Sequence, residues 1–528
     1  MPVVRTGWRD DQGFTLVAVM GAMAVLTLFL LGSLEYALQG MAPNRKDQDA
    51  KASVAAAQAG IDDFVSRLNV NDRYWVNNSA DTYPTVGDSA NAALTPAGIP
   101  MPGTGAGQVT YHYAVLSTSA QTTQTGAIRL QSTGRSRDAS RTLIAQLQPS
   151  GFLRYIYFTD IETQDPALWD TSRTDCSRYH YAVSPAGARP SNCRDIQFAT
   201  GDVIRGPLHS NDALWINGSV KFTDPKTETS WKDGASPAPA PNHRWWGTGT
   251  PDSSGYNPVY QASIVLPTAN SEIQQYADPA KSDEDAPGCL YSGQTRIRFE
   301  GTKMRVLSPS TTTGTKSRCY NTSTPNFEQL VDIPPVIYVQ QLSGACGAGG
   351  IGYPIAGETT TYNCQDGDAF VRGTATGQVT VATANNVVVT GDLKTTTNDL
   401  TGTDVIGLVA NNYLWVHHPV NSSGNNILTS ANSVHEIDAA ILSVLHSFLV
   451  QNWDQGAPLS TIGVDASKLT VKGAIAQKFR GPVGTGSGAG IATGYLKNYI
   501  YDPRLMTLPP PYFLKPVSAP WGVSKLSE

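Results

Sequence analysis

The chain has 528 residues, of which 40% are apolar and only 15% are charged, with 49 glycines and 34 prolines. This length is enough for about two to four domains, and the low charge content is typical of exported, turn-rich β proteins. The formal net charge of −5 excludes the strongly basic overall character of a protein that coats nucleic acid, although a local basic patch stays compatible with it.

An uncharged apolar run from Phe14 to Leu34 dominates the N-terminus. As a helix, its twenty-one residues would be about 31 Å long, which matches the core of a bilayer. The run is longer than the apolar region of a secretory signal peptide, and no small-residue cleavage site closes it. We therefore expect a helix that stays in the mature protein, and a plain single-pass anchor is the simplest alternative.

A polar leader, MPVVRTGWRDDQ, ends at Gly13 and is followed directly by Phe14, Thr15 and Leu16. In this order of leader, glycine, phenylalanine and apolar helix, the chain resembles the type IV prepilins over about fifteen residues. The resemblance implies that a prepilin peptidase cuts between Gly13 and Phe14, and that Phe14 becomes the N-methylated terminus. It also implies that the helix is held first in the cytoplasmic membrane, and then packs against other pilin subunits in an extracellular filament.

One position departs from the prepilin pattern. Pilins usually carry Glu at the fifth mature position, where it pairs with the terminal amine of a neighbour, and here that position is Ala18. A buried charge is costly unless it is paired, so the substitution changes how this subunit can pack. In related secretion filaments, subunits without this Glu tend to be tip or minor subunits. The resemblance therefore favours a minor or tip subunit over a major one.

The helix is predicted to continue, with a kink or a restart at Pro43. From Ala50 to Leu68 apolar residues recur at helical spacing, so this half should pack on a sheet. We assign residues 1–13 to the leader, 14–70 to the helix and 71–160 to an antiparallel, pilin-like β head. The expected strands of the head are 109–117, 127–135, 140–148 and 152–160. This order of elements resembles PilX-type pilus assembly proteins.

Residues 161–528 are predicted to form a large, mostly β extracellular domain, which makes the fold class α+β. Within 371–420, short apolar runs recur every eight to fifteen residues and are divided by Asn, Gly or Asp. Such runs fit the rungs of a parallel β-solenoid, which we favour over a β-sandwich. Residues 223–260, rich in Pro, Gly and Ser, form a loop insertion, and residues 495–516 should run back along the body as an extended strap.

All the cysteines follow the apolar helix, and their even number fits an oxidising compartment. Spacing favours three local disulfides, although six cysteines allow fifteen connectivities. A metal site is disfavoured because no C-x-x-C motif is present. The favoured pairs are Cys176–Cys193, Cys289–Cys319 and Cys346–Cys364.

Three groups of residues are weak candidates for binding. Asp160, Glu162 and Asp165 could hold calcium, but a solvated acidic loop is favoured. Trp245 and Trp246 could form a binding surface, but packing of their loop on the body is slightly favoured. The cations Arg296, Arg298, Lys303 and Arg305 could contact phosphates, but an ordinary solvated strand face is favoured.

No catalytic set is convincing, so we expect no enzyme activity and no cofactor. The G-x-S-x-G match at 484–488 lies in a glycine-rich run, GTGSGAG, without the strand-to-helix context of a nucleophile. The main hypothesis is a structural minor or tip pilin whose body serves adhesion or captures a surface glycan, a protein or DNA. Two alternatives remain: a DNA-uptake receptor at a pilus tip, and a membrane-tethered glycan-active enzyme, which needs two carboxylates in one cleft.

Overall fold

The computed structural model describes residues 12–71, 73–82, 88–104, 109–149, 151–182, 187–241, 243–397, 400–429, 432–458, 468–487, 490–517 and 521–527. The chain forms two compact units. The first, here called the head unit, is residues 1–117 with 129–145 and 526–528. The second, the body, is residues 118–128 with 146–525.

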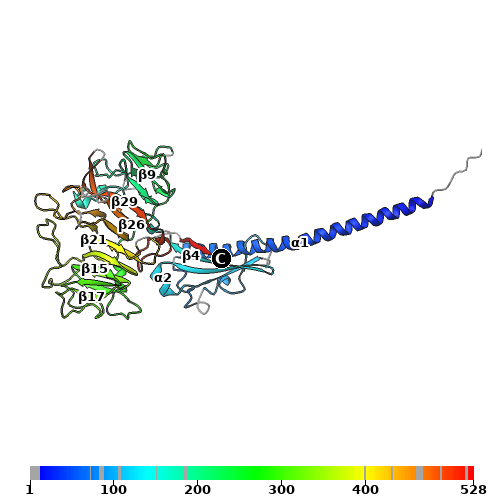
Figure 1. The fold of residues 1–528 in the computed structure, drawn as a ribbon, viewed down its shortest axis with the longest axis horizontal. Coiled ribbons are helices and arrows are strands. Elements are labelled where there is room, and N and C mark those ends of the chain that lie inside the picture. The colour runs from blue at the N-terminus through cyan, green and yellow to red at the C-terminus, as the bar shows by residue number, and fades with distance from the viewer. Residues whose placement is uncertain are drawn as a thin grey trace, which may run out of the picture. The chain divides into compact units, whose positions relative to one another are not determined.

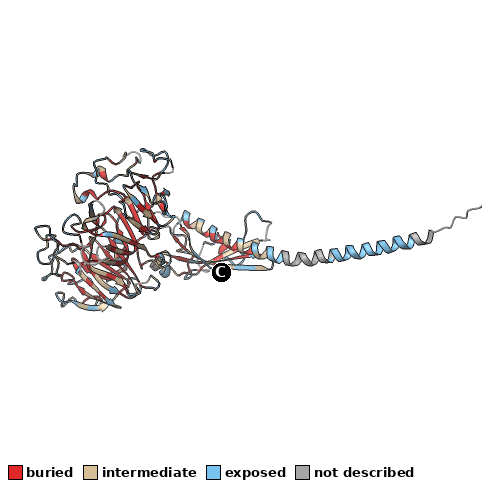
Figure 2. Cartoon of the chain, turned by 45° about the horizontal axis from the view of Figure 1, so that its top comes forward, coloured by how far each residue is buried: buried red, intermediate tan, exposed pale blue. Residues whose placement is uncertain are grey.

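The head unit is organised on α1 (Gln12–Val70), a single helix of 59 residues (Figure 1). The helix includes Pro43, so this proline does not separate two helices as a restart would have done. The segment Leu16–Ser33 has a mean hydropathy of 2.3 and is 0% buried, and it is long and apolar enough to cross a membrane. Figure 2 shows this first half of α1 exposed and the second half with a buried face.

The second half of α1 packs on an antiparallel sheet, as its periodicity predicts. The sheet has the order β1 (Ile99–Pro100), β2 (Val109–Val115), β3 (Ile128–Ser136), β4 (Ala139–Pro149) and β30 (Trp521–Ser527). Ile61 and Phe64 of the helix are fully buried, and Tyr113 Oη donates to Asp63 at 2.7 Å. Helix and sheet meet so closely at Gly134 that a Cβ there would lie 2.0 Å from Ser53 O.

The fourth strand predicted for the head belongs to the body instead. Strand β5 (Tyr157–Ile161) pairs in parallel with β26 (Lys468–Phe479) and with β7 (Leu208–Ser210). The boundary expected at residue 160 therefore lies too late in the chain. In the head, β30 from the far C-terminus follows β4 in the sheet order, and Ser527 Oγ donates to Ile144 O. The alternation of a strand indicates which side is buried but not which strand it pairs with.

The body is built from parallel ladders of short strands. In spatial order the first ladder is β14 (Cys289–Ser292), β18 (Val336–Gln340), β20 (Gln378–Thr383), β22 (Val405–Ala410), β24 (Glu436–Ser443), β26, β5, β7, β10 (Thr227–Thr229) and β13 (Val259–Tyr260). The second is β15 (Thr295–Gly301), β19 (Ala369–Ala375), β21 (Val387–Thr395), β24, β26, β29 (Leu496–Tyr501), β6 (Val203–Arg205), β9 (Ser219–Phe222) and β12 (Thr250–Pro251).

A third side carries β23 (Leu414–Val416) and β25 (Phe448–Val450) next to β21, and separately β8 (Leu214–Trp215) next to β11 (Trp245–Trp246). Antiparallel pairs add β16 (Lys303–Leu307) and β17 (Gln329–Asp332) beside β15, and the hairpin β27 (Gly484–Ser487) with β28 (Gly490–Gly494). The short helix α2 (Ser119–Thr125) completes this unit. Successive strands that pair in parallel make stacked rungs, the arrangement favoured by the sequence over two facing antiparallel sheets.

Stacked rungs share one apolar interior. Ile337, Val381, Leu408, Ile441, Ile475, Tyr157 and Leu208 are consecutive register partners along the first ladder, and all are buried. Burying one such aliphatic side chain stabilises a fold by about 1.5–3 kcal/mol. The column therefore joins rungs that are far apart in sequence into one core.

The spatial order of the rungs differs from their chain order. The rungs of residues 157–260 stack beyond β26, which comes much later in the chain, and the chain returns through residues 264–288 to begin β14. On this return path Asn270 Nδ2 donates to Thr383 O and Val409 O, so it crosses the outer side of the first ladder. The expected C-terminal strap begins later than predicted, because β29 is itself a rung. The segment after β29 packs on the outer side of the first ladder, where Phe513 and Leu514 are buried.

Candidate functional site

The predicted processing site lies at the beginning of α1. The backbone of Gly13 and Phe14 is helical, while leader residues 1–11 and the side chains of Gln12, Phe14 and Thr15 lie outside the described part of the structure. Ala18, in the next turn, is exposed. The cut expected between Gly13 and Phe14 therefore remains a prediction of the sequence.

The first half of α1 presents apolar side chains on all sides. Leu16, Met20, Leu28 and Phe29 are each more than 60% exposed, and a Cβ added to Gly21 or Gly32 would meet nothing within 4 Å. A contiguous apolar surface of this kind marks a contact with lipid or with other apolar helices. Small residues on such a helix allow the backbones of neighbouring helices to approach closely.

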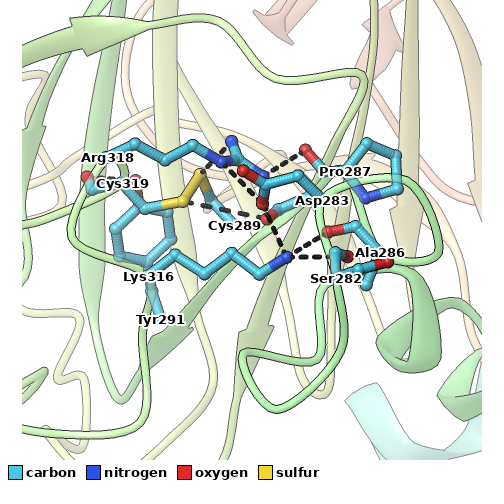
Figure 3. The surroundings of a disulfide bond; sticks show 10 residues. Ser282, Asp283, Ala286, Pro287, Cys289, Tyr291, Lys316, Arg318 and Cys319 are labelled. Atoms are coloured by element: carbon cyan, nitrogen blue, oxygen red, sulfur yellow. Dashed lines mark hydrogen bonds and ion pairs between the residues drawn. A yellow bond between two sulfur atoms is a disulfide. The ribbon is translucent and has the colours of Figure 1, made fainter.

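The three disulfides have the pairing that spacing favoured: Cys176–Cys193, Cys289–Cys319 and Cys346–Cys364. Cys289 opens β14, where the return path ends and the rungs begin again. Close to this disulfide, Lys316 Nζ donates to Asp283 Oδ1 at 2.8 Å and to Ala286 O at 2.6 Å (Figure 3). Arg318 Nε donates to the same carboxylate at 3.1 Å. The disulfide and these two cations fix the end of the return path to the body.

Of the acidic residues proposed for calcium, Glu162 and Asp165 are buried and Asp160 is half-buried, and each has its own side-chain partners, so the expected solvated acidic loop is wrong. Asp160 Oδ1 accepts from Tyr179 Oη and from Asn211 Nδ2, both at 2.8 Å. Asp165 Oδ2 accepts from Tyr413 Oη at 2.9 Å and contacts His446 Nδ1. Among the described residues no group of three His, Cys, Asp or Glu side chains could hold a metal ion.

Glu162, the third of these acids, forms an ion pair inside the body. Its Oε2 lies 3.0 Å from Arg480 Nη1, and the two side chains are 0% and 2% exposed. Burial raises the pKa of Glu162, while the Arg480 guanidinium acts in the opposite direction. No pattern in the sequence indicated that Arg480 is buried. The two partners are 318 residues apart in the sequence, so no local pattern could indicate that they pair.

The tryptophans of the loop insertion pack on the body, as slightly favoured. Trp245 is 5% exposed, and its neighbour Trp246 stacks on Trp215 with ring centroids 4.9 Å apart and planes 6° apart. His180 stacks on Trp246 at 4.6 Å. The insertion is not only loop, since it supplies β10 to β13. Its tryptophan side chains therefore pack on the body, whereas Tyr256 and Tyr260 are exposed.

The four candidate phosphate-binding cations are all paired with carboxylates. Arg298 and Arg305 lie 2.7 Å and 3.0 Å from Glu300. Arg296 lies 3.1 Å from Glu328, and Lys303 lies 2.7 Å from Asp332. Paired charges of both signs on β15 and β16 form an ordinary strand face, as favoured, and do not form a continuous basic groove.

Residues 484–487 of the G-x-S-x-G match are strand β27 of a hairpin with β28, and not a strand-to-helix turn. The geometry therefore does not expose a nucleophile in the way that such an elbow would.

Comparison with known proteins adds a family motif. Residues 8–34 match the prokaryotic N-terminal methylation motif. Among curated proteins none matches the chain. One solved structure with a detectable likeness is the competence-associated pilin ComZ from Thermus thermophilus, at 13% identity and a TM-score of 0.28, covering 91% of this chain and 97% of that one. The chain thus carries a prokaryotic N-terminal methylation motif at the start of a long helix whose first half is apolar.

Proposed function

We propose that this protein is a minor or tip subunit of a type IV pilus-like filament, and that a single pass of α1 holds it in the cytoplasmic membrane before assembly. One observation carries the proposal: the N-terminal methylation motif of residues 8–34 contains an 18-residue apolar segment of α1 in which no residue is buried. Such a segment needs lipid, or other apolar helices, around it. The partners are prepilin peptidase, the membrane and other pilin subunits.

Ala18 supports a minor or tip position. Its methyl group leaves the helix without a carboxylate at the place where a neighbour's charged terminus would otherwise need a partner. Insertion beside a subunit whose amine requires such a pair would leave a buried charge unpaired, which is strongly unfavourable. A subunit at the end of a filament avoids this arrangement on one side.

In this proposal the body acts by binding and not by catalysis. It supplies adhesion or captures a ligand outside the cell, and three disulfides suit it to that environment. DNA capture is less well supported, because the cations expected to contact phosphate are already paired with carboxylates. A glycan-active enzyme is less well supported too, because Glu162 and Asp195 are each paired with an arginine.

The test is to purify filaments from cells that express the full chain, and to determine both its N-terminus and its copy number relative to the main subunit. We expect a mature N-terminus at Phe14 and a low copy number, with the protein located at filament ends. A terminus at Met1, or incorporation along the whole shaft at high copy number, would refute the proposal.

A further inference from the structure

The third side of the body is interrupted where the last rung of the chain meets the rungs of residues 157–260. The first two ladders continue across this junction through β26 with β5 and β29 with β6. On the third side Val450 N donates to Pro482 O, and Phe198 pairs with Ile216. In the described part of the chain, no backbone hydrogen bond joins residues 482–486 to residues 196–199.

A cavity of about 660 Å³ occupies this interruption. The volume is within the range of roughly 300–1,000 Å³ that is usual for small-molecule sites. Its lining comes from both sides of the gap and from the interior of the rungs. The lining includes Gln164, Arg194, Trp215, Trp453, Tyr495 and Lys497.

Lys497 stands in an interior position of its rung. In the register its partner is Leu469, which is fully buried, and Tyr499, on the same side of β29, is also buried. Burial lowers the pKa of Lys497 to about 8. A lysine at a position otherwise given to apolar side chains is costly unless something compensates its charge.

The acids that line the same cavity are already engaged. Asp195 lies 2.7 Å from Arg189, and Asp202 Oδ2 accepts from Ala199 N at 3.0 Å. Among described residues neither Lys497 nor Arg194 lies within 4.0 Å of a carboxylate. The Arg194 guanidinium lies 4.8 Å from the Trp169 ring centroid, and the charges of Asp202 and Glu162 act on Lys497 without a direct contact. The Lys497 ammonium can therefore still make a charge-assisted hydrogen bond to an anionic group of a ligand.

The indole rings of Trp215 and Trp453 give the cavity flat apolar surfaces. Trp215 is held by its stack on Trp246, so its ring is fixed in place before any ligand arrives. Gln164 adds an amide that can both donate and accept hydrogen bonds. Rigid aromatic surfaces beside an amide and cations fit a ring that has apolar faces, hydroxyl groups and a negative charge.

We propose that this cavity binds an acidic saccharide, with its carboxylate against Lys497 and its ring against Trp215 or Trp453. This gives a ligand class to the capture role under the proposed function and rests on it for biological meaning. The binding itself can be tested separately, because Lys497 lies in the body and takes no part in α1.

The test uses the full chain in detergent micelles and isothermal titration with tri-galacturonate, with the fully methyl-esterified trisaccharide as the neutral match. We expect the acid to bind at least tenfold more tightly than the ester, and Lys497→Met to remove that preference. Lys478→Met, which removes a half-buried lysine outside the cavity, should leave it unchanged. As a second measurement, tri-galacturonate should protect Lys497 from acetylation at pH 8.

Equal affinity for acid and ester, absence of binding, or an unchanged preference in Lys497→Met would overturn the proposal. Competition by acetate at the same concentration would also overturn it, since it would show a plain anion site. If binding fails while filaments still form with Phe14 at the terminus, the site is refuted and the pilin function stands. If filaments fail while tri-galacturonate binds, the opposite holds.

Discussion

Two regions of this chain that are rich in apolar residues have opposite surroundings. In its described part the first half of α1 exposes large apolar side chains such as Leu16, Leu28 and Phe29, whereas the rungs of the body bury their inward apolar side chains. Both satisfy their backbone hydrogen bonds, the helix within itself and the rungs between neighbours. The helix thus satisfies its backbone hydrogen bonds but leaves its apolar side chains exposed. The first half of α1 therefore needs an apolar partner outside this chain, whereas the rungs of the body bury their apolar side chains against one another.

The largest expected effect concerns the helix. Replacing Gly13 by Leu places a bulky side chain at the predicted cut, so the peptidase should leave the leader attached and filaments should lack the protein. Mass spectrometry of the N-terminus and immunolabelling of filaments measure this. The matched control is Gly21→Ala, whose added methyl group meets nothing within 4 Å, and it should be cut normally. A Gly13→Leu protein that begins at Phe14 would show that this junction does not direct processing.

The second prediction concerns the closed interior of the body. Glu162→Gln leaves Arg480 buried without its counter-charge, and breaking a buried pair in this way costs about 3–5 kcal/mol. The measurement is urea unfolding followed by the fluorescence of body tryptophans. A loss below about 1 kcal/mol would mean that water reaches Arg480, and that the interior is not closed at this rung.

The third prediction is a pH dependence. Burial raises the pKa of Asp368 to about 7, although its carboxylate accepts from Asn386 N and Asn385 Nδ2. In the unfolded chain the pKa is near 3.9, so between these values the folded state binds more protons and stability falls as pH rises. At about 1.4 kcal/mol per pKa unit, the loss from pH 4 to pH 8 is at most about 4 kcal/mol.

Asp368→Asn keeps an accepting oxygen and cannot ionise, so its stability should change less over the same pH range. Thermal unfolding at several pH values compares the two proteins. If the original chain instead becomes more stable from pH 4 to pH 8 relative to Asp368→Asn, the sign of this shift is wrong.

The fourth prediction compares two disulfides of the body. Removing Cys289–Cys319 with a double alanine variant releases a loop of 30 residues, which costs about 3.5 kcal/mol in chain entropy. Both sulfurs are buried, so a cavity cost is added. The control, removal of Cys346–Cys364, opens a shorter loop at exposed positions and should cost less. Equal losses would mean that packing around Cys289 contributes little.

The smallest expected effect is on the strand face of β15 and β16. Glu300→Gln removes the partner of Arg298 and Arg305, which are more than a third exposed. Exposed pairs contribute about 0–1 kcal/mol, so the unfolding midpoint should barely move. The same variant leaves Arg298 without its carboxylate and Arg305 with only Glu328, 4.0 Å away. An electrophoretic shift of DNA that appears only with Glu300→Gln would show that pairing blocks nucleic-acid binding. A shift with the original chain would contradict the paired surface described here.

Local patterns were enough to predict the pieces of the fold. The apolar run of α1, its amphipathic second half, the strands at 109–148 and the short runs of the body follow from spacing along the chain. Local spacing also favoured the correct disulfides, because each joins cysteines no more than 30 residues apart. The ion pairs of Arg298 and Lys303 are likewise within or near one hairpin.

By itself, the sequence determined that a long apolar helix precedes a series of β units, because those signals depend on a residue and its near neighbours. Only the tertiary structure decided that β5 stacks on β26, that Glu162 meets Arg480 from 318 residues away, and that an interior lysine faces a cavity between two rungs. A strand shows the same alternation whichever strand it pairs with, so partners distant in sequence leave no trace in it. Those partners are chosen by the packing of the whole interior.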